Sequence, residues 1–375
     1  MLTPRSTLAR RVAAALDASP SRIPVVVGLC GSGRTTLIQQ LRDRDGCGPA
    51  IPIDVERTAT TPERFARALA SASPLPFPEP PAGSGARAAF AAALEGFRQV
   101  RTDSGEPVTF LLDEFLELRT FESFPGLRRV IYEFIDCVSS SSNRFVLTSR
   151  YVVRTGRLLR DRSARFEIIP VPGFTLEEVL DVMNLGPTAD AGDQEYTARS
   201  IQALADGRAA YVRALADELA LMRERGGGDP VSALAALLAP DGRLDKVCRF
   251  SYELRLHRAR GYGALKAILE ILADEEGLTL TEISQRLQRT PGSTKDYLSW
   301  LEDVDLVAAR QKRYNFADPL LRLWVRLRCR PSPPSEDEIA REVRRYALPR
   351  LPQQPEPALA MAAAAGGASG LIEID

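Results

Sequence analysis

A glycine-rich segment between an apolar run and a helical run most constrains what this chain can fold into. Residues 23–28 are largely β-branched and apolar, as in a buried strand, and residues 35–41 continue as a helix. The segment that joins them reads Gly28-Leu29-Cys30-Gly31-Ser32-Gly33-Arg34-Thr35-Thr36. It has the phosphate-loop spacing, in which a glycine, four residues and a second glycine precede a basic residue and a hydroxyl. Strand, loop and helix in this order predict a site for nucleotide phosphates.

The physical basis of this prediction is a convergence of donors. Glycines let backbone N–H groups approach phosphate oxygens, and the next helix presents unsatisfied N–H groups and its positive dipole end to the same anion. Thr35 supplies a hydroxyl for a magnesium ion. Arg34 stands where the motif has lysine: arginine keeps the charge and binds phosphate through two N–H groups, but it is planar and bulkier. The alternative is a chance glycine turn with Arg34 exposed. The residues expected to contact the nucleotide here are Gly28, Cys30, Gly31, Ser32, Gly33, Arg34, Thr35 and Thr36.

Two acids follow a second buried strand, residues 108–112. Asp113 is expected beside the magnesium ion, together with Thr35, and Glu114 is expected to polarise a water molecule against the terminal phosphate. The next buried strand, 144–149, carries Thr148 near its end, where a polar side chain can sense that phosphate or the water. The expected catalytic residues are therefore Glu114, Arg34 and Thr148, and the expected metal ligands are Thr35 and Asp113.

The 375 residues suggest two or three domains. Strands at 51–55, 108–112, 144–149 and 165–170 alternate with a helix that opens at Thr61 and helices at 86–100 and 124–138, which predicts an α/β domain with a parallel sheet covered on both faces. After Pro172 only helices follow, at 175–185, 193–205 and 209–223. The expected division is an N-terminal helix (1–22), an α/β core (23–172), a helical lid (173–240), a winged helix (241–330), and a charged helix with a low-complexity tail (331–375).

Composition excludes several classes of protein. Lys and Arg total 49, as do Asp and Glu, so no net charge draws the chain onto nucleic acid or membrane, and no apolar run approaches the length of a membrane span. The single histidine, His257, leaves no set of imidazoles for zinc. The five scattered cysteines and the absence of a signal-peptide pattern lead us to expect reduced thiols and a cytoplasmic location. These cysteines are Cys30, Cys47, Cys137, Cys248 and Cys329.

Together these segments resemble the AAA+/STAND group of P-loop ATPases, and most closely its archaeal-type ATPase family with a C-terminal winged helix. The phosphate loop, the block at 111–115, the segment 166–178 and the run 314–324 carry the resemblance. It implies ATP and Mg²⁺ as ligands and a nucleotide-driven switch. In the family a Gly-x-Pro-type motif lies near the nucleotide; here Gly207-Arg208-Ala209 lacks the proline, and Arg208 is either a sensor of ATP or a surface arginine. Because the family's hydrolysis relies on the lysine that Arg34 replaces, slow turnover and a non-hydrolysing ATP-bound scaffold or DNA-binding regulator both stay open.

The C-terminal region has the spacing of a helix-turn-helix followed by a β wing. From Leu306 to Arg330 there are seven basic residues and one acid, a local charge of +6, whereas the expected recognition helix is acidic. Contact with DNA through Arg310, Lys312 and Arg313 is therefore one open interpretation, and a winged helix that docks on protein or makes only intramolecular contacts is the other. A homo-oligomer is also open. Three arginines before the last strand are candidates for a finger that reaches a neighbouring subunit, or are solvated charges: Arg160, Arg162 and Arg165. The end of the tail, 371–375, is either a frayed terminus or a docking segment.

Overall fold

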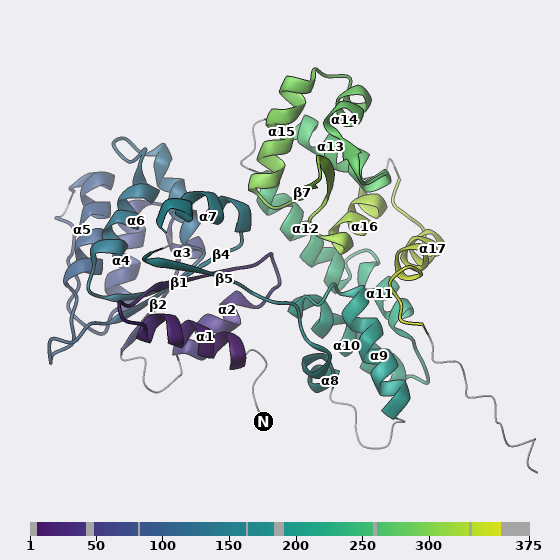
Figure 1. The fold of residues 1–375 in the computed structure, drawn as a ribbon, viewed down its shortest axis with the longest axis horizontal. Helices are drawn as coiled ribbons and strands as arrows, with labels where there is room; N and C mark the ends of the chain where they lie inside the picture. Colours follow the sequence, from purple (N-terminus) through teal and green to yellow (C-terminus); the bar gives the residue numbers. More distant parts are fainter. Residues whose placement is uncertain are drawn as a thin grey trace, which may run out of the picture.

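The computed structural model describes residues 6–42, 49–81, 83–162, 164–183, 191–257, 261–329 and 332–353. The expectations for Cys47 and for the tail at 354–375 lie outside these residues. Figure 1 shows an α/β part that holds the large sheet and a second part made of helices and a small sheet. No helix among the described residues is long and apolar enough to cross a membrane.

The large sheet has five parallel strands in the order β2-β3-β4-β1-β5. The strands are β1 (Ile23–Val27), β2 (Ala50–Asp54), β3 (Thr109–Asp113), β4 (Arg144–Ser149) and β5 (Phe166–Pro170). The predicted strands are thus present within one or two residues at each end. Because β4 lies between β3 and β1, the carboxyl ends of these three strands meet at one edge, where ligands bind in open parallel sheets.

Helices cover both faces of this sheet, as predicted. On one face α1 (Ser6–Asp17) and α2 (Arg34–Arg42) pack against Leu111, Val146 and Ile169. On the other face phenylalanines dominate, with ring centroids of Phe97 and Phe110 5.0 Å apart. The elements on that side or at the sheet edge are α3 (Val55–Thr58), α4 (Pro62–Ala72), α5 (Gly85–Gln99), η1 (Phe115–Ser123), α6 (Val130–Ser140), α7 (Val152–Leu159) and η2 (Arg160–Arg162).

One helix begins later than the sequence predicted. A helix was expected from residue 124, but α6 begins at Val130. The chain after β3 forms the 3₁₀ segment η1 and then turns through Pro125-Gly126, where Gly126 has a φ of 77°. That left-handed conformation suits glycine and interrupts a regular helix.

Between β5 and residue 257 the described residues form five helices, two more than the sequence predicts. They are α8 (Leu176–Met183), α9 (Ala191–Leu204), α10 (Ala209–Glu224), α11 (Pro230–Leu238) and α12 (Arg243–Leu256). The additional two are α11 and α12. The Asp229 side chain caps α11 by accepting from Val231 N at 2.8 Å, and Pro230 takes its first position.

Residues 262–328, which we call the C-terminal module, have the element order expected of a winged helix. They contain α13 (Tyr262–Asp274), β6 (Leu278–Thr279), α14 (Leu280–Leu287), α15 (Pro291–Asp303), β7 (Val307–Arg310), β8 (Arg313–Phe316) and α16 (Pro319–Arg328), and α17 (Glu336–Ala347) follows. The strands form an antiparallel sheet in the order β6-β8-β7. Thr290 caps α15, and Leu298, Leu301 and Trp324 are buried.

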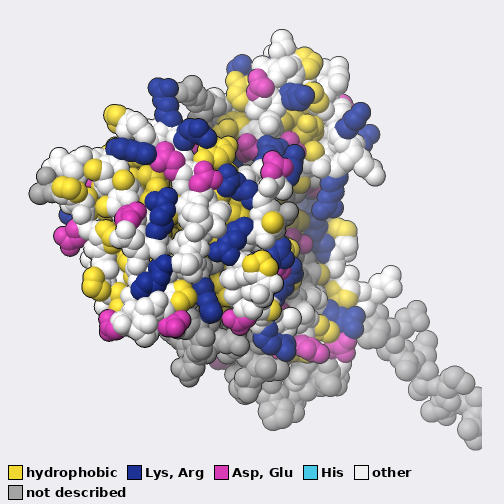
Figure 2. All heavy atoms as spheres, turned by 60° about the vertical axis from the view of Figure 1, so that its left-hand side comes forward, with side chains coloured by type: hydrophobic (Ala, Val, Ile, Leu, Met, Phe, Trp, Pro, Cys, Tyr) yellow, Lys and Arg dark blue, Asp and Glu magenta, His cyan; other side chains and the backbone are white. Residues whose placement is uncertain are grey.

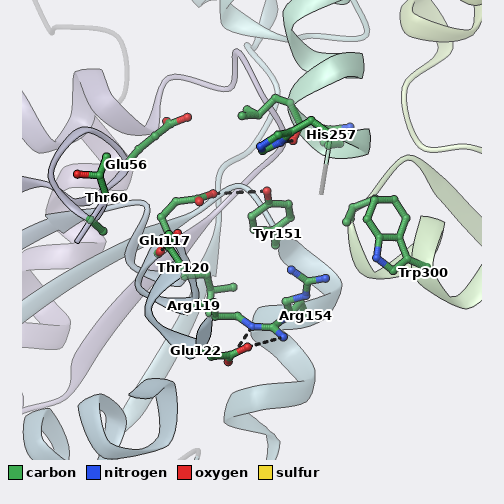
Figure 3. Close-up of a pocket in the computed structure, with 15 residues that line it drawn as sticks. Glu56, Thr60, Glu117, Arg119, Thr120, Glu122, Tyr151, Arg154, His257 and Trp300 are labelled. Atoms are coloured by element: carbon green, nitrogen blue, oxygen red, sulfur yellow. Dashed lines mark hydrogen bonds and ion pairs between the residues drawn. The ribbon is translucent and has the colours of Figure 1, made fainter. Parts of the chain in front are cut away.

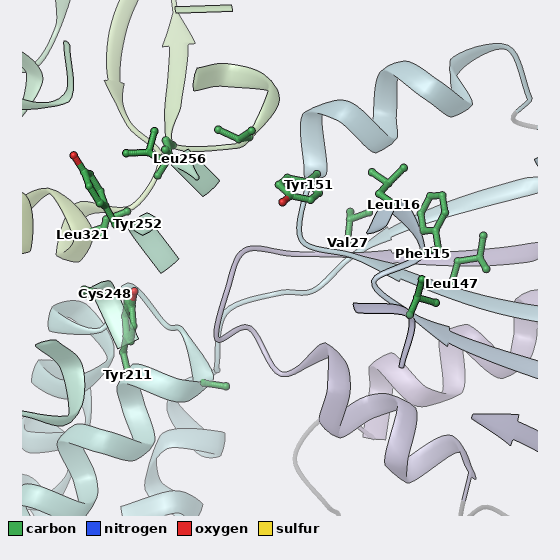
Figure 4. Packing of buried hydrophobic residues seen from close by; sticks show 14 of the residues in the cluster. Val27, Phe115, Leu116, Leu147, Tyr151, Tyr211, Cys248, Tyr252, Leu256 and Leu321 are labelled. Carbon is green, nitrogen blue, oxygen red and sulfur yellow. The ribbon is translucent and has the colours of Figure 1, made fainter. Parts of the chain in front are cut away.

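The C-terminal module contacts the α/β part mainly through polar groups. The Asp305 carboxylate accepts hydrogen bonds from the backbone N–H groups of Val152 (2.6 Å) and Val153 (3.3 Å) at the start of α7. Arg157 of α7 pairs with Asp303 at the end of α15. Figure 4 shows the apolar side chains gathered on either side of this region, with Leu147 and Phe115 in one group and Tyr252 and Leu321 in the other.

Candidate nucleotide-phosphate site

The glycine-rich loop leaves β1 at the sheet edge and enters α2. Gly31 and Gly33 have φ values of 77° and 96°, a region that residues with a Cβ rarely adopt. At Gly28 there is no room for a side chain, because a Cβ there would lie 2.7 Å from Ser32 Oγ. Gly28 N donates to Ser149 O at 3.2 Å, which fixes the loop to the end of β4. The three glycines of the motif are therefore needed for the shape of the loop.

The Arg34 side chain folds back into this loop instead of lying exposed on α2. Its Nη1 donates to Leu29 O at 2.7 Å and to Ser32 Oγ at 3.1 Å, and also to Gly28 O. The residue is 7% exposed, and its buried Nε has no hydrogen-bond partner. The interior of the loop thus holds a cation with one donor free, which suits an anionic ligand.

Asp113 connects the loop helix to the neighbouring strand. Its Oδ2 accepts from Thr35 Oγ1 at 2.7 Å, and its Oδ1 accepts from Thr148 Oγ1. Burial raises the pKa of Asp113 above its ordinary value, although the hydrogen bonds from Thr148 and Thr35 act in the opposite direction. Three residues that the sequence placed at the site, from three different elements, therefore meet around one carboxylate.

Glu114 is held between two arginines. Its Oε1 lies 2.6 Å from Arg34 Nη2, and its Oε2 lies 2.9 Å from Arg150 N and 3.0 Å from Arg150 Nε. Burial would raise the pKa of Glu114, but the charges of Arg34 and Arg150 outweigh burial and lower it. Arg150 also pairs with Glu56 after β2, so this network crosses three neighbouring strand ends. With both oxygens engaged, Glu114 is a carboxylate that needs Arg34 to move before it can accept a proton.

The helix α10, in the region expected to form the lid, contacts the same loop. Ala210 N donates to Gly31 O at 2.9 Å, and a Cβ on Gly31 would lie 2.9 Å from the Ala210 Cβ. Arg208, expected as a sensor of ATP, is 8% exposed and its Nη1 lies 2.7 Å from Asp318 Oδ2 in the C-terminal module. The structure thus brings Arg208 to the contact between lid and module, and its role toward ATP stays a prediction.

Oxygen ligands suit magnesium at this site. Thr35 and Asp113 offer a hydroxyl and a carboxylate side by side, and Mg²⁺ commonly takes one or two protein oxygens together with substrate phosphates. The described residues contain no group of three or more His, Cys, Asp or Glu side chains that could hold a metal ion by themselves. The donor set therefore fits a magnesium ion that arrives with a nucleotide and does not fit a site made by protein alone.

The fold can be compared with solved structures. A Walker-type ATPase of Pyrococcus abyssi aligns with a TM-score of 0.63 and 17% identity, over 86% of this chain and 95% of that chain. The chain has the P-loop NTPase fold. Cdc6p of Pyrobaculum aerophilum is less similar, with a TM-score of 0.41 and 13% identity over 94% of this chain and 96% of that one. The Orc1 protein of Aeropyrum pernix in complex with DNA has a TM-score of 0.44 and 18% identity, over 86% and 92%. No protein-family model and no curated protein matches the sequence.

The sequence did not predict one residue of the candidate site in this P-loop NTPase fold. Arg150, which follows Thr148 and Ser149, holds Glu114 and is 3% exposed. Its signal was available, since a basic residue at the end of a buried strand points to the edge where Asp113 and Glu114 lie. The three finger candidates differ in their surroundings: Arg162 pairs with Asp136 at 2.6 Å, Arg165 donates to Ser141 O at 3.2 Å, and Arg160 is exposed.

The basic C-terminal face is smaller than the sequence count suggested. Arg322 pairs with Glu276 at 3.0 Å, Arg326 with Glu342 at 3.1 Å and Arg328 with Asp245 at 2.8 Å. The exposed cations on the β7–β8 hairpin are Arg310, Lys312 and Arg313. On the face drawn in Figure 2, Lys and Arg side chains are mixed with acidic and apolar ones and form no single basic surface.

A cavity of 450 Å³ lies beyond the carboxyl ends of β2, β3 and β4. Figure 3 shows Glu117 and Tyr151 from the α/β part on one side of it and Trp300 and His257 on the other, with Arg154 of α7 between. Because the lining residues come from the α/β part and from the C-terminal half of the chain, a change in the position of the C-terminal module changes the cavity.

Proposed function

We propose that this chain binds ATP with Mg²⁺ and hydrolyses ATP slowly, as a switch that acts on its C-terminal module. The observation that carries the proposal is the ion pair of Arg34 with Glu114 inside a phosphate loop that also presents Thr35 and Asp113. One arginine serves both the loop and the acid expected to activate water. Binding of phosphate at the loop would then also free the Glu114 carboxylate from Arg34.

The mechanism follows from competition for Arg34. Phosphate oxygens bound at the loop attract the guanidinium away from Glu114 Oε1, while Arg150 keeps hold of Oε2 and fixes the position of the carboxylate. The freed oxygen accepts a proton from a water molecule as the water oxygen bonds to the terminal phosphorus. The bond from that phosphorus to the bridging oxygen breaks, which yields ADP and phosphate. Thr35 and Asp113 would hold a magnesium ion that arrives with the nucleotide, and this ion would supply charge neutralisation for the phosphates.

Hydrolysis is slow in this proposal because Arg34 must satisfy two demands. The guanidinium has to reach the phosphates and leave Glu114, and in the free protein it makes contacts to Gly28 O and Leu29 O as well. Thr148 supports the acid by accepting from Glu114 N at 3.0 Å. Arg208, tied to Asp318, is proposed to report ATP to the C-terminal module.

Calorimetry with ATP and Mg²⁺ and a phosphate-release assay test the proposal. We expect wild-type protein to bind ATP and release phosphate slowly, Glu114→Gln to bind ATP with turnover reduced at least about 100-fold, and Arg34→Lys to turn over faster than wild type. Arg119→Lys, at an arginine that pairs with Glu122 outside the phosphate site, is the matched control. If neither wild type nor Arg34→Lys binds any nucleotide, the proposal is wrong.

The second candidate is a scaffold that binds ATP without turnover, favoured by the engagement of both Glu114 oxygens in the free protein. ATP binding without phosphate release in wild type would decide for it. Contact of the wing with DNA is a separate part of the proposal. We expect a weak complex that is lost when Arg310, Lys312 and Arg313 become alanine, with a salt dependence corresponding to about three phosphates.

A further inference from the structure

Two buried side chains of α12 lie near Cys30 of the phosphate loop and have polar atoms without a hydrogen-bond partner. Ser251 and Arg255 are one helical turn apart, and they are 1% and 2% exposed. Ser251 Oγ makes no hydrogen bond of normal geometry, and Arg255 Nε and Nη2 have no partner. Both residues are close enough to Cys30 to influence its thiol, Arg255 through its charge and Ser251 through its hydroxyl. A cation without a counter-ion is rare at such burial and costs stability unless something pairs with it.

A second arginine near Cys30, Arg34, also has a donor without a partner. Arg34 Nε, inside the loop, is also buried without a partner. Arg255 makes one hydrogen bond, from Nη1 to Asp305 O at 3.1 Å, and makes no ion pair within 4 Å among the described residues. One nitrogen of Arg255 is thus bonded to the C-terminal module, and its other two nitrogens have no hydrogen-bond partner. Donors without a partner, from α2 and from α12, therefore both lie close to Cys30.

We propose that Ser251 and Arg255 form the far wall of the phosphate site and bind phosphate oxygens of the nucleotide held by the loop. This inference rests on the proposed function. In this proposal α12, a helix outside the α/β part that the sequence did not predict, contributes side chains that contact the phosphates of the nucleotide. Arg255 would then link phosphate directly to the C-terminal module, because its Nη1 is already bonded to Asp305 O.

Arg255→Met tests the inference, because methionine fills similar space without charge. We expect the ATP affinity of this variant to fall about 10- to 100-fold and that of inorganic tripolyphosphate to fall in parallel. Removal of an unpaired buried cation relieves a cost in the free protein, so its melting temperature without nucleotide is expected to stay equal or to rise. A merely structural role for Arg255 predicts the opposite pair of results, a lower melting temperature with unchanged affinity. Arg255→Lys keeps the charge and is expected to recover part of the affinity.

Arg249→Met is the matched control on the same helix. Its guanidinium is 53% exposed and pairs with Asp245, so we expect unchanged ATP affinity. Ser251→Ala tests the same wall with a smaller change and is expected to lose affinity about threefold or more. If wild type binds ATP and both Arg255→Met and Ser251→Ala bind it as tightly, this inference is overturned and the proposed function stands. If wild type and Arg34→Lys bind no nucleotide, both fail.

Discussion

Arg34 shows how one substitution within a motif changes the physics of a site. A lysine at this position is a point charge on a flexible stem, whereas arginine has a planar group with separate donors on each side. Here one side of the guanidinium, Nη1, binds the loop and the other, Nη2, binds Glu114. The same geometry that allows arginine to hold phosphate also allows it to hold the acid, which is why we expect lysine at this position to accelerate turnover.

Cys30 is the residue whose chemistry this arrangement alters most visibly. Burial would raise the pKa of its thiol, but the charges of Arg255, Arg150 and Arg34 outweigh burial and lower it. Cys329, also partly exposed, has a raised pKa because of burial. We therefore expect iodoacetamide at pH 7 to modify Cys30 at least about three times faster than Cys329, measured by peptide mass spectrometry. Equal rates, or a faster Cys329, would contradict the cluster of positive charge around the loop.

Among the elements, α16 is fixed by a single acid at its start. Asp318 is 1% exposed, caps α16 through Leu320 N and Leu321 N, and accepts from Arg208 and from Tyr211 Oη at 2.8 Å. Within the run 314–324, the segment Ala317-Asp318-Pro319 is therefore explained by a helix cap that also connects α10 to the C-terminal module.

Asp318→Ala is expected to destabilise the chain strongly. The change leaves Arg208 and the Tyr211 hydroxyl buried without their acceptor and removes the cap, which together cost about 3–5 kcal/mol. Denaturant unfolding measures this loss. Asp217→Ala breaks an exposed pair with Arg243 and is expected to change the free energy of unfolding by less than about 1 kcal/mol. A loss for Asp318→Ala as small as that of the control would mean that the buried cluster is not formed.

Asp305 gives the contact between α7 and the C-terminal module a pH dependence. Burial raises its pKa from 3.8 to about 6, although hydrogen bonds from Val153 N and Val152 N and the charges of Arg255 and Arg154 oppose this. A carboxyl with a raised pKa in the folded state favours folding below its unfolded pKa, and that contribution is lost as pH rises through about 6. Asp303, on the same turn, stays paired with Arg157.

Asp305→Asn removes this titration while it keeps one acceptor for the α7 amides. Between pH 4.5 and 7 the free energy of unfolding of wild type should fall relative to that of the variant by about 2 kcal/mol, the part of the shift from 3.8 to about 6 that is expressed in this interval. Urea unfolding at several pH values measures both proteins. If the free energies of unfolding of the two proteins depend on pH in the same way, Asp305 is not buried between the two parts as described.

The elements also show what the sequence could and could not predict. Phosphate loop, buried strands and their terminal acids are local patterns, and parallel pairing alone brings Thr35, Asp113 and Thr148 together at one sheet edge. The ion pair of Arg34 with Glu114 joins residues 80 positions apart and depends on side-chain packing. The helix α12 was missed because it mixes charged and apolar residues, and its buried Arg255 reads as a surface charge until the fold is known.

For the whole molecule, a chain of contacts connects the phosphate loop to the C-terminal module. The loop contacts α10 through Gly31, α10 begins at Arg208, which is bonded to Asp318, and Asp305 joins α12 to α7, which starts two residues after Arg150. Two routes thus lead from the phosphates to the module, one through the lid and one through α12. A ligand shifts the position of the module only to the extent that it binds one arrangement better than another.

Hydrogen exchange with and without ATP and Mg²⁺ tests this chain of contacts over the whole molecule. In wild type we expect slower exchange both in the loop and α2 and at a distance, at the α7 amides of Val152 and Val153 and in α15, because phosphate orders Arg255 and so its contact with Asp305. In Arg255→Met, at ATP concentrations that saturate the variant, the loop should still be protected while protection at α7 and α15 is reduced. If the distant protection persists in full, coupling runs through Arg208 and the lid alone, and α12 does not transmit nucleotide state.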